Sequence, residues 1–122
     1  MFSFQKETPI YLQLMDEIKG QIAAGKLTPG EKIASIREMA AFYAVNPNTV
    51  QRALLELERE ELISTKRASG KTVTEDVKMV HELRESLAAI KVQNFLLAME
   101  ALGYSKEEIA ALVNRVIKEG KK

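Results

Sequence analysis

The sequence predicts a mainly α-helical protein that contains one small β-hairpin. Apolar residues recur at helical spacing along most of the 122-residue chain, and recognisable capping signals open several of these segments. Two short β-prone runs stand together in the middle of the chain, after the third helical segment. Three helices followed by a hairpin make a winged helix-turn-helix. We therefore predict that fold for residues 1–75 and a two-helix dimerisation extension for residues 76–122.

The first helix is predicted between residues 8 and 25. Thr8 and Pro9 supply an N-cap and a first helical residue, and Gly25 supplies a C-terminal cap. Apolar side chains every four residues give this helix one buried stripe: Ile10, Leu14, Ile18 and Ile22.

Two short helices joined by a tight turn are predicted over residues 31–57. Ser35 and Glu38 form a capping box at the start of the first. Asn46 is a good N-cap for the second, and Pro47 suits its first position, where no N–H is needed. Apolar residues on one face of the second helix are expected to be buried: Val50, Ala53, Leu54 and Leu57.

Polar side chains gather in the first turns of that second helix, away from its apolar face. They are Asn48, Thr49, Gln51 and Arg52. Amides, a hydroxyl and a guanidinium at the N-terminal end of a helix can read base edges in the DNA major groove. The same residues also suit a capped, solvated helix end, so this pattern alone leaves both interpretations open.

The hairpin is predicted from β-prone runs at residues 62–65 and 72–74 around the polar loop 66–71. The loop is basic and includes Arg67 and Lys71. A solvated turn is the simpler interpretation of a charged loop. Its place directly after the predicted recognition helix favours a DNA-binding wing.

Residues 8–74 resemble the DNA-binding domain of the GntR family of bacterial transcription regulators. The motifs that carry the resemblance are PIYLQLMDEIKGQIAAGKLTPGEKI, SIREMA and VNPNTVQRALLELEREELI. The short segment behind them resembles the YtrA subfamily. The resemblance implies that Arg37 contacts the phosphate backbone. It also implies base or backbone contacts from the recognition turn and helix, at Asn46, Asn48, Thr49 and Gln51, and minor-groove contacts from the wing, at Arg67, Ala68 and Ser69. Ser35, Arg52 and Lys71 complete our predicted DNA-binding set.

The sequence departs from the family pattern in three places. Ile33-Ala34-Ser35 replaces Leu-Pro-Ser before the arginine, and Pro47 replaces an arginine often found in the recognition turn. In the wing, Ala68 stands where the family usually has the first glycine, and Ala68 cannot adopt positive φ cheaply. These changes bear on individual contacts rather than on the fold.

A heptad-like apolar seam followed by a striped helix is predicted beyond residue 76. Apolar residues of the seam and the last helix form the predicted dimer interface: Val80, Leu83, Leu87, Ile90, Leu97, Ile109, Leu112, Val113 and Val116. Ser105 and Glu108 form a second capping box. Asn94 lies in the seam and either fixes its register or faces solvent. Packing of some of these residues on the winged helix is the alternative to a homodimer.

Composition excludes several other functions. The chain has no cysteine, and its single histidine, His81, stands among charged residues, so we expect neither a metal site nor a cofactor. We find no nucleophile–base pair and expect no enzyme activity. No apolar run is long enough to span a bilayer, and the start lacks the layout of a signal peptide, which favours a cytoplasmic protein.

We therefore predict a transcriptional repressor that binds a palindromic DNA operator as a homodimer. Residues 1–76 carry ten Lys and Arg against eleven Asp and Glu, so any DNA-binding surface must come from uneven placement of charge. That balance supports an alternative, a winged helix used for protein–protein contact without DNA. The sequence does not decide whether a small-molecule effector binds. Room for one is expected between the C-terminal helices or at the dimer seam.

Overall fold

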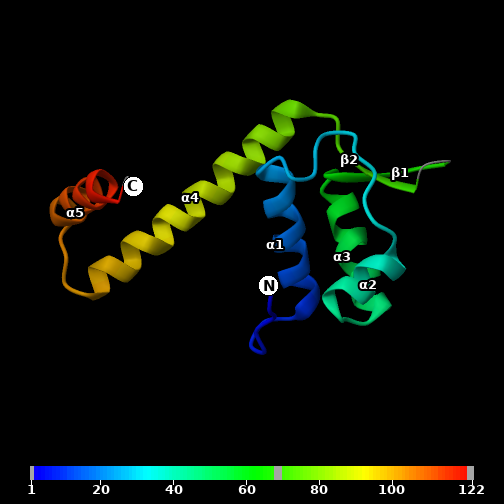
Figure 1. Ribbon diagram of the computed structural model, residues 1–122, viewed down its shortest axis with the longest axis horizontal. Coiled ribbons are helices and arrows are strands. Elements are labelled where there is room, and N and C mark those ends of the chain that lie inside the picture. Colours follow the sequence, from blue (N-terminus) through cyan, green and yellow to red (C-terminus); the bar gives the residue numbers. More distant parts are fainter. Residues whose placement is uncertain (1, 68–69, 121–122) are drawn as a thin grey trace. The chain divides into compact units, whose positions relative to one another are not determined.

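The computed structural model describes residues 2–67 and 70–120, and the chain divides into two compact units, Met1–Arg84 and Glu85–Lys122. The predicted fold class is confirmed: helices account for most of the chain, and one hairpin interrupts them (Figure 1). The elements in chain order are α1 (Ile10–Ala23), α2 (Ile36–Tyr43), α3 (Pro47–Arg59), β1 (Ile63–Lys66), β2 (Gly70–Val73), α4 (Val77–Ala101) and α5 (Lys106–Glu119).

The first unit is built around α3, which packs against α1, α2 and β1. The largest fully buried side chains come from these elements and from β2, and they include most of the predicted stripes: Leu14, Ile18, Ile22, Val50, Leu54, Leu57, Ile63 and Val73. Full burial of each such side chain stabilises the fold by about 1.5–3 kcal/mol. Ile10 is an exception to the predicted stripe, because it remains 42% exposed at the start of α1.

The ends of α1 differ partly from the prediction. Thr8 is not the N-cap: the helix begins at Ile10, and Pro9 holds the cap position without a side-chain hydrogen bond. The predicted C-terminal signal is confirmed, since Gly25 has φ +80° directly after the cap residue. A side chain at that φ would be strained, so glycine lets the chain turn sharply away from the helix.

The predicted hairpin is confirmed as an antiparallel pair in which Ile63 lies opposite Val73 and Lys66 lies opposite Gly70. The segment that precedes α2 also joins this pair, through a bridge between Lys32 and Thr72. The hairpin is thereby attached to the start of the helix-turn-helix. Ala68 and Ser69, which stand between the two strands in the sequence, lie outside the described residues.

The second unit consists of the remainder of α4 and of α5. The predicted capping box opens α5: Ser105 Oγ accepts from the Glu108 N–H at 3.1 Å, and Glu108 Oε1 accepts from the Ser105 N–H at 2.9 Å. Gly103, with φ +96°, allows the turn between the helices. An ion pair of 2.6 Å between Lys106 Nζ and Glu100 Oε2 joins their ends.

The division into compact units falls inside α4, after Arg84. The first turns of α4 therefore belong to the winged-helix unit. The functional boundary after residue 75 stays a prediction.

Candidate nucleic-acid interface

The turn between α2 and α3 is set by local hydrogen bonds. Ser35 and Glu38 form the predicted capping box at the start of α2, with bonds of 3.0 and 3.1 Å. The hydrogen bond from the Ser35 backbone holds the pKa of the Glu38 carboxyl below its usual value. Ala44 then takes the left-handed conformation, with φ 57°, and Asn46 Oδ1 accepts from the Asn48 N–H at 2.7 Å. These contacts fix the angle at which α3 leaves the turn.

The side chains of Ser35 and Asn46 are therefore already used as caps. Each keeps a donor, the Ser35 hydroxyl hydrogen and the Asn46 amide N–H groups, which can bond a phosphate or a base edge. Both residues are exposed. Their predicted DNA contacts are compatible with capping.

The N-terminal half of α3 presents the predicted recognition residues on its open face. Asn48, Gln51 and Arg52 are exposed and Thr49 is half-buried, whereas the opposite face of the helix is buried in the core. Helical spacing puts residues 48 and 52 on one face, one turn apart. This arrangement offers two amides and a guanidinium side by side, which suits hydrogen bonding to base edges.

Arg52 stacks on an aromatic ring that sequence analysis did not single out. Its Cζ lies 3.9 Å from the centroid of the Tyr11 ring on α1. A guanidinium over an aromatic face is held by a cation–π interaction. The contact joins residues 41 positions apart, so no local sequence signal could reveal it.

A second basic group lies beside the start of α2. Arg37 is exposed on the first turn of that helix, as predicted. A hollow of about 520 Å³ next to it is lined by the start of α2 and by the hairpin residues Gly70 and Lys71. Lys32, which sequence analysis did not include, lines the same hollow and is exposed. Three cations thus border one concave surface.

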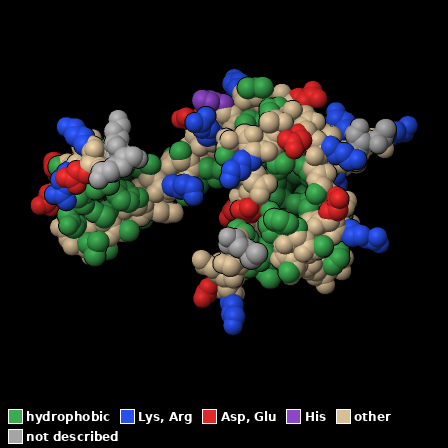
Figure 2. Space-filling view, viewed as in Figure 1, with side chains coloured by type: hydrophobic (Ala, Val, Ile, Leu, Met, Phe, Trp, Pro, Cys, Tyr) green, Lys and Arg blue, Asp and Glu red, His purple; other side chains and the backbone are tan. Residues whose placement is uncertain are grey.

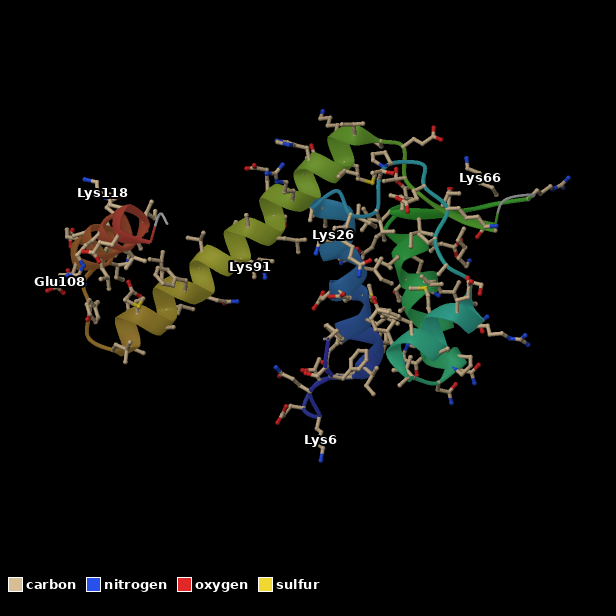
Figure 3. All side chains as sticks on the ribbon, viewed as in Figure 1. Lys6, Lys26, Lys66, Lys91, Glu108 and Lys118 are labelled. Carbon is tan, nitrogen blue, oxygen red and sulfur yellow. The ribbon has the colours of Figure 1, made fainter. Side chains whose placement is uncertain are left out.

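The hairpin carries basic residues to its tip. Lys and Arg side chains gather over the hairpin, at the right of Figure 2, and Figure 3 labels Lys66 at the end of β1. Lys66 and Arg67 are exposed. The predicted wing residue Ser69 falls outside the described residues.

Lys71 differs from the other predicted wing residues because its ammonium group is paired with side chains of this protein. Its Nζ lies 3.2 Å from Glu58 Oε2 and donates to Thr65 Oγ1 at 3.1 Å. Its side chain is only 26% exposed. To contact DNA, Lys71 would have to exchange the Glu58 carboxylate for a phosphate.

Acidic residues at the C-terminal end of α3, and Glu60 just after it, pair with cations. Glu56 bonds Arg59 at 2.6 Å, and Glu60 bonds Lys19 of α1 at 2.8 Å. The carboxylates are thereby neutralised within the fold. The recognition end of α3 is free of acidic side chains from residue 47 to residue 55.

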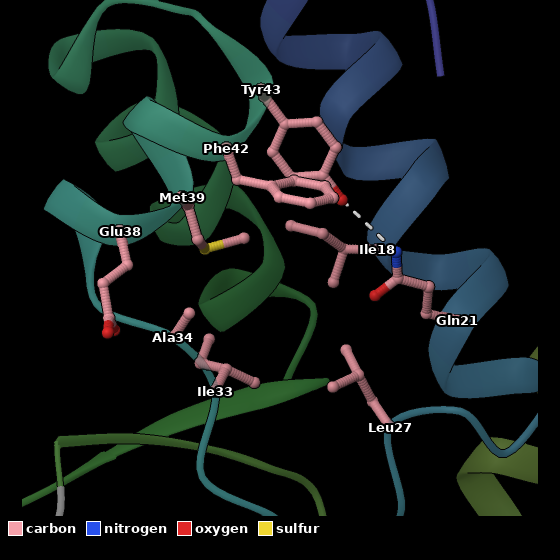
Figure 4. A pocket seen from close by; sticks show the side chains of 9 residues that line it. All are labelled: Ile18, Gln21, Leu27, Ile33, Ala34, Glu38, Met39, Phe42 and Tyr43. Carbon is pink, nitrogen blue, oxygen red and sulfur yellow. Dashed lines mark hydrogen bonds between the residues drawn. The ribbon is translucent and has the colours of Figure 1, made fainter. Parts of the chain in front are cut away.

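An apolar hollow of about 410 Å³ lies between α1 and α2, a volume in the range of small-ligand sites (Figure 4). Phe42, which is 79% exposed, borders it. Its polar lining residues already bond neighbours: Gln21 Nε2 donates to the Tyr43 hydroxyl at 3.3 Å, and Glu38 caps α2. From the sequence, room for a small molecule is expected only between the C-terminal helices or at the dimer seam.

Three of the nine predicted dimer residues are used within the chain. Val80 and Leu83 pack against the winged-helix core, which is the alternative that the sequence left open, and Ile109 is buried. Leu87, Leu112 and Val113 are half-buried, while Ile90, Leu97 and Val116 are exposed. Asn94 is exposed. The unpartnered apolar surface is therefore concentrated beyond residue 85.

Other chemistry has little support within residues 2–67 and 70–120. His81 is exposed on α4, and no group of three or more His, Asp or Glu side chains there could hold a metal ion. The same part of the chain contains no helix with the length and apolar character needed to cross a membrane.

Comparison with known proteins identifies the fold and its role. The family of bacterial regulatory proteins called gntR matches residues 10–73. The chain belongs to this family. It is a DNA-binding transcriptional regulator and not an enzyme, as predicted.

Two Bacillus subtilis (strain 168) proteins are similar over most of their length. The uncharacterized HTH-type transcriptional regulator YhcF is 41% identical over 106 residues, 87% of this chain and 88% of its own. The HTH-type transcriptional repressor YtrA is 31% identical over 122 residues, 97% of this chain and 94% of its own. The predicted resemblance to the GntR family and its YtrA subfamily is thereby confirmed.

Solved structures of GntR family regulators have the same fold as this chain. A GntR family transcriptional regulator from Listeria monocytogenes superposes with a TM-score of 0.84 at 41% identity, covering 93% of this chain and 99% of its own. The DNA-binding domain of AraR, in complex with operator ORX1, covers 61% of this chain and 93% of its own, with a TM-score of 0.54 at 27% identity.

Proposed function

We propose that this regulator is a repressor that binds a palindromic operator as a homodimer, through the N-terminal half of α3, Arg37 and the wing. The exposed row on α3 carries the proposal: Asn48 and Arg52 stand one turn apart, with Gln51 beside them. Repression is supported by the similarity of nearly the whole chain to YtrA, a transcriptional repressor. We also place its action in the cytoplasm, where bacterial DNA is found.

The contacts divide by what each group can recognise. Asn48 and Gln51 carry amides, which can bond an adenine edge bidentately, so they are assigned to base recognition. Arg37, Lys66 and Arg67 are assigned to phosphates and the adjoining groove, because a cation on an exposed turn or loop holds the backbone without reading sequence. Five positions thus supply both affinity and specificity.

Dimer formation is supported by apolar surface that the second unit leaves exposed. Many large apolar side chains beyond residue 85 are more than two-fifths exposed: Ile90, Val92, Phe95, Leu97, Leu102, Tyr104, Val116 and Ile117. Large apolar side chains exposed in this number within one short unit support an interface. A second copy is the occupant that also supplies a second recognition helix for the other half of a palindrome.

Footprinting on the DNA upstream of the protein's own gene tests the whole proposal, because it gives the binding site, its symmetry and the half-site spacing together. We expect a protected palindrome whose half-sites are about one helical turn apart or slightly more. A single unpaired half-site would contradict the homodimer. Full-length protein that binds no duplex better than unrelated DNA would contradict operator binding and favour the protein-contact alternative.

A further inference from the structure

We propose that the first turn of α1 forms part of the DNA interface, where Tyr11 holds Arg52 against one sugar–phosphate strand of the operator. This inference rests on the proposed function, since it assumes that α3 enters the major groove. It adds a backbone-binding hollow between α1 and α3. It also assigns a positioning role to Tyr11.

The hollow has a volume of about 370 Å³ and an open mouth. Two residues of α1, Ile10 and Tyr11, line one side, and three residues of α3, Asn48, Thr49 and Arg52, line the other. Tyr11 is half-buried and packs against the core, so it cannot move freely. Ile10 is 42% exposed, although its position in the α1 stripe predicted burial.

The lining matches the chemistry of a nucleic-acid backbone. Arg52 and Thr49 provide N–H and O–H donors for phosphate oxygens. Ile10 provides apolar surface for a deoxyribose. The lining contains no carboxylate that would repel a phosphate.

The geometry of the stack makes Arg52 available to a ligand. Its Cζ lies 3.9 Å from the centroid of the Tyr11 ring, so the aromatic face covers one side of the guanidinium. The N–H donors of a guanidinium radiate in its own plane, and stacking therefore leaves them open. An arginine already held in position loses less freedom when it binds.

DNA is the occupant that we infer, because the hollow adjoins the recognition residues of α3. Asn48 and Thr49 line the hollow and also lie in the first turn of α3, next to Gln51. A strand that borders the major groove entered by α3 would pass this first turn. The α1 residues would then touch the backbone on the side of α3 away from the wing-bearing hairpin.

Binding of the full-length protein to its footprinted operator tests the inference. Tyr11→Phe keeps the ring and should bind within about twofold of wild type, whereas Tyr11→Leu should bind about 2- to 5-fold more weakly. Arg52→Lys keeps the charge but not the planar stack, and it should also lose about 2- to 5-fold. Arg52→Ala should in addition lower the slope of log affinity against log salt by about 1, as expected for one lost phosphate contact.

The double variant separates positioning from simple destabilisation. Once Arg52 is Ala, adding Tyr11→Leu should cost no further affinity, because Tyr11 has no guanidinium to hold. Arg59→Ala is the matched control. It removes the same charge from the same helix, at the end where Arg59 pairs with Glu56, and it should bind like wild type. Thermal melts of each variant check folding.

Three results would overturn the inference: unchanged affinity of Arg52→Lys, an unchanged salt slope for Arg52→Ala, or additive losses in the double variant. Each of these leaves the proposed function intact, since the wild-type protein still binds its operator. If the wild-type protein shows no operator binding, both the proposed function and this inference are contradicted. If Tyr11→Leu does not fold, Arg52→Lys and the salt slope still decide.

Discussion

Lys71 of β2 and Glu58 of α3 form an ion pair in which Nζ lies 3.2 Å from Oε2. Thr65 of β1 completes the cluster, because its hydroxyl donates to the Glu58 carboxylate and accepts from Lys71 Nζ. Both strands of the hairpin are thus bonded to the recognition helix. The wing and α3 are thereby held at a fixed spacing, which a protein that contacts two grooves of DNA requires.

The cluster makes stability depend on pH. The Thr65 hydroxyl, followed by Lys71, holds the pKa of Glu58 below its ordinary value of 4.5. A carboxyl whose pKa is lowered by folding stabilises the folded state above its unfolded pKa, and that contribution is lost as pH falls through the folded pKa. Glu58→Gln should therefore lower the free energy of unfolding by about 0.5–1.5 kcal/mol at pH 7. The gap from wild type should narrow as the pH falls below about 4.

Urea denaturation at pH 7 and pH 3 measures this gap. Glu7→Gln is the control, because Glu7 is exposed in the N-terminal segment, and it should match wild type at both pH values. A Glu58→Gln deficit that is equally large at pH 3 would show that the charge of Glu58 is not what stabilises the hairpin.

Arg37 is expected to contribute affinity without specificity. It is exposed on the first turn of α2, beside the hollow that Lys32 also lines. Phosphates are the same at every base pair, so Arg37→Ala should weaken operator and unrelated DNA by similar factors. Fluorescence anisotropy with both duplexes measures this. Arg115→Ala, the same change on α5, should bind normally, and unchanged affinity of Arg37→Ala at moderate salt would remove Arg37 from the interface.

Gln51 and Asn48, unlike Arg37, are expected to contribute sequence specificity. Each can bond a base edge, so Gln51→Ala should relax preference at one position of each half-site and cost about 1–3 kcal/mol on the preferred base. Asn48→Ala should do the same at another position. Selection of bound sequences from a half-site library reads out both. If the substitution lowers affinity equally for all sequences, the residue contacts the DNA backbone and not a base.

The salt dependence of operator binding should be shallow to moderate. Residues 1–76 have one more acidic than basic residue, and Lys19, Arg59 and Lys71 are already paired with carboxylates. Few cations therefore remain for DNA. Each phosphate contact contributes a slope of about −0.9. Titration across a range of KCl concentrations measures the total, and a steep slope would mean that the internal ion pairs open on DNA.

Elements set by near neighbours could be predicted from the sequence. Both capping boxes and the Asn46-Pro47 start of α3 use residues within three positions of each other, and all three are confirmed. The apolar face of α3 could be predicted in the same way, because helical periodicity alone places its four buried residues on one side.

Contacts between distant segments could not be predicted. Tyr11 reaches Arg52, and Glu58 reaches Lys71, only after α1 and the hairpin have packed on α3. The burial of residues in the predicted dimer seam could not be predicted either. Val80 and Leu83 share the spacing of Leu97, but the core lies within reach of the first two residues, and their burial depends on tertiary structure that periodicity does not contain.

The remaining apolar surface yields a prediction about assembly. Leu97 is 61% exposed on α4, and Val116 is 55% exposed on α5. If a second copy covers this surface, Leu97→Asp would bury an unpaired charge and should produce monomers at micromolar concentration. Light scattering coupled to size exclusion measures the mass directly. Ala88→Asp, which places the same charge at an exposed position of α4 outside the seam, should stay dimeric.

The monomeric variant should keep its winged helix and lose tight operator binding. The core of the first unit does not include Leu97, so melting of that unit should be little changed. Each half-site would then be bound separately, and the gain in affinity from linking two recognition helices would disappear. Binding to an isolated half-site should be the same for Leu97→Asp and wild type, which makes the half-site duplex the internal reference. A wild-type monomer would contradict the homodimer, and a Leu97→Asp dimer that binds the palindrome normally would show that the interface lies elsewhere.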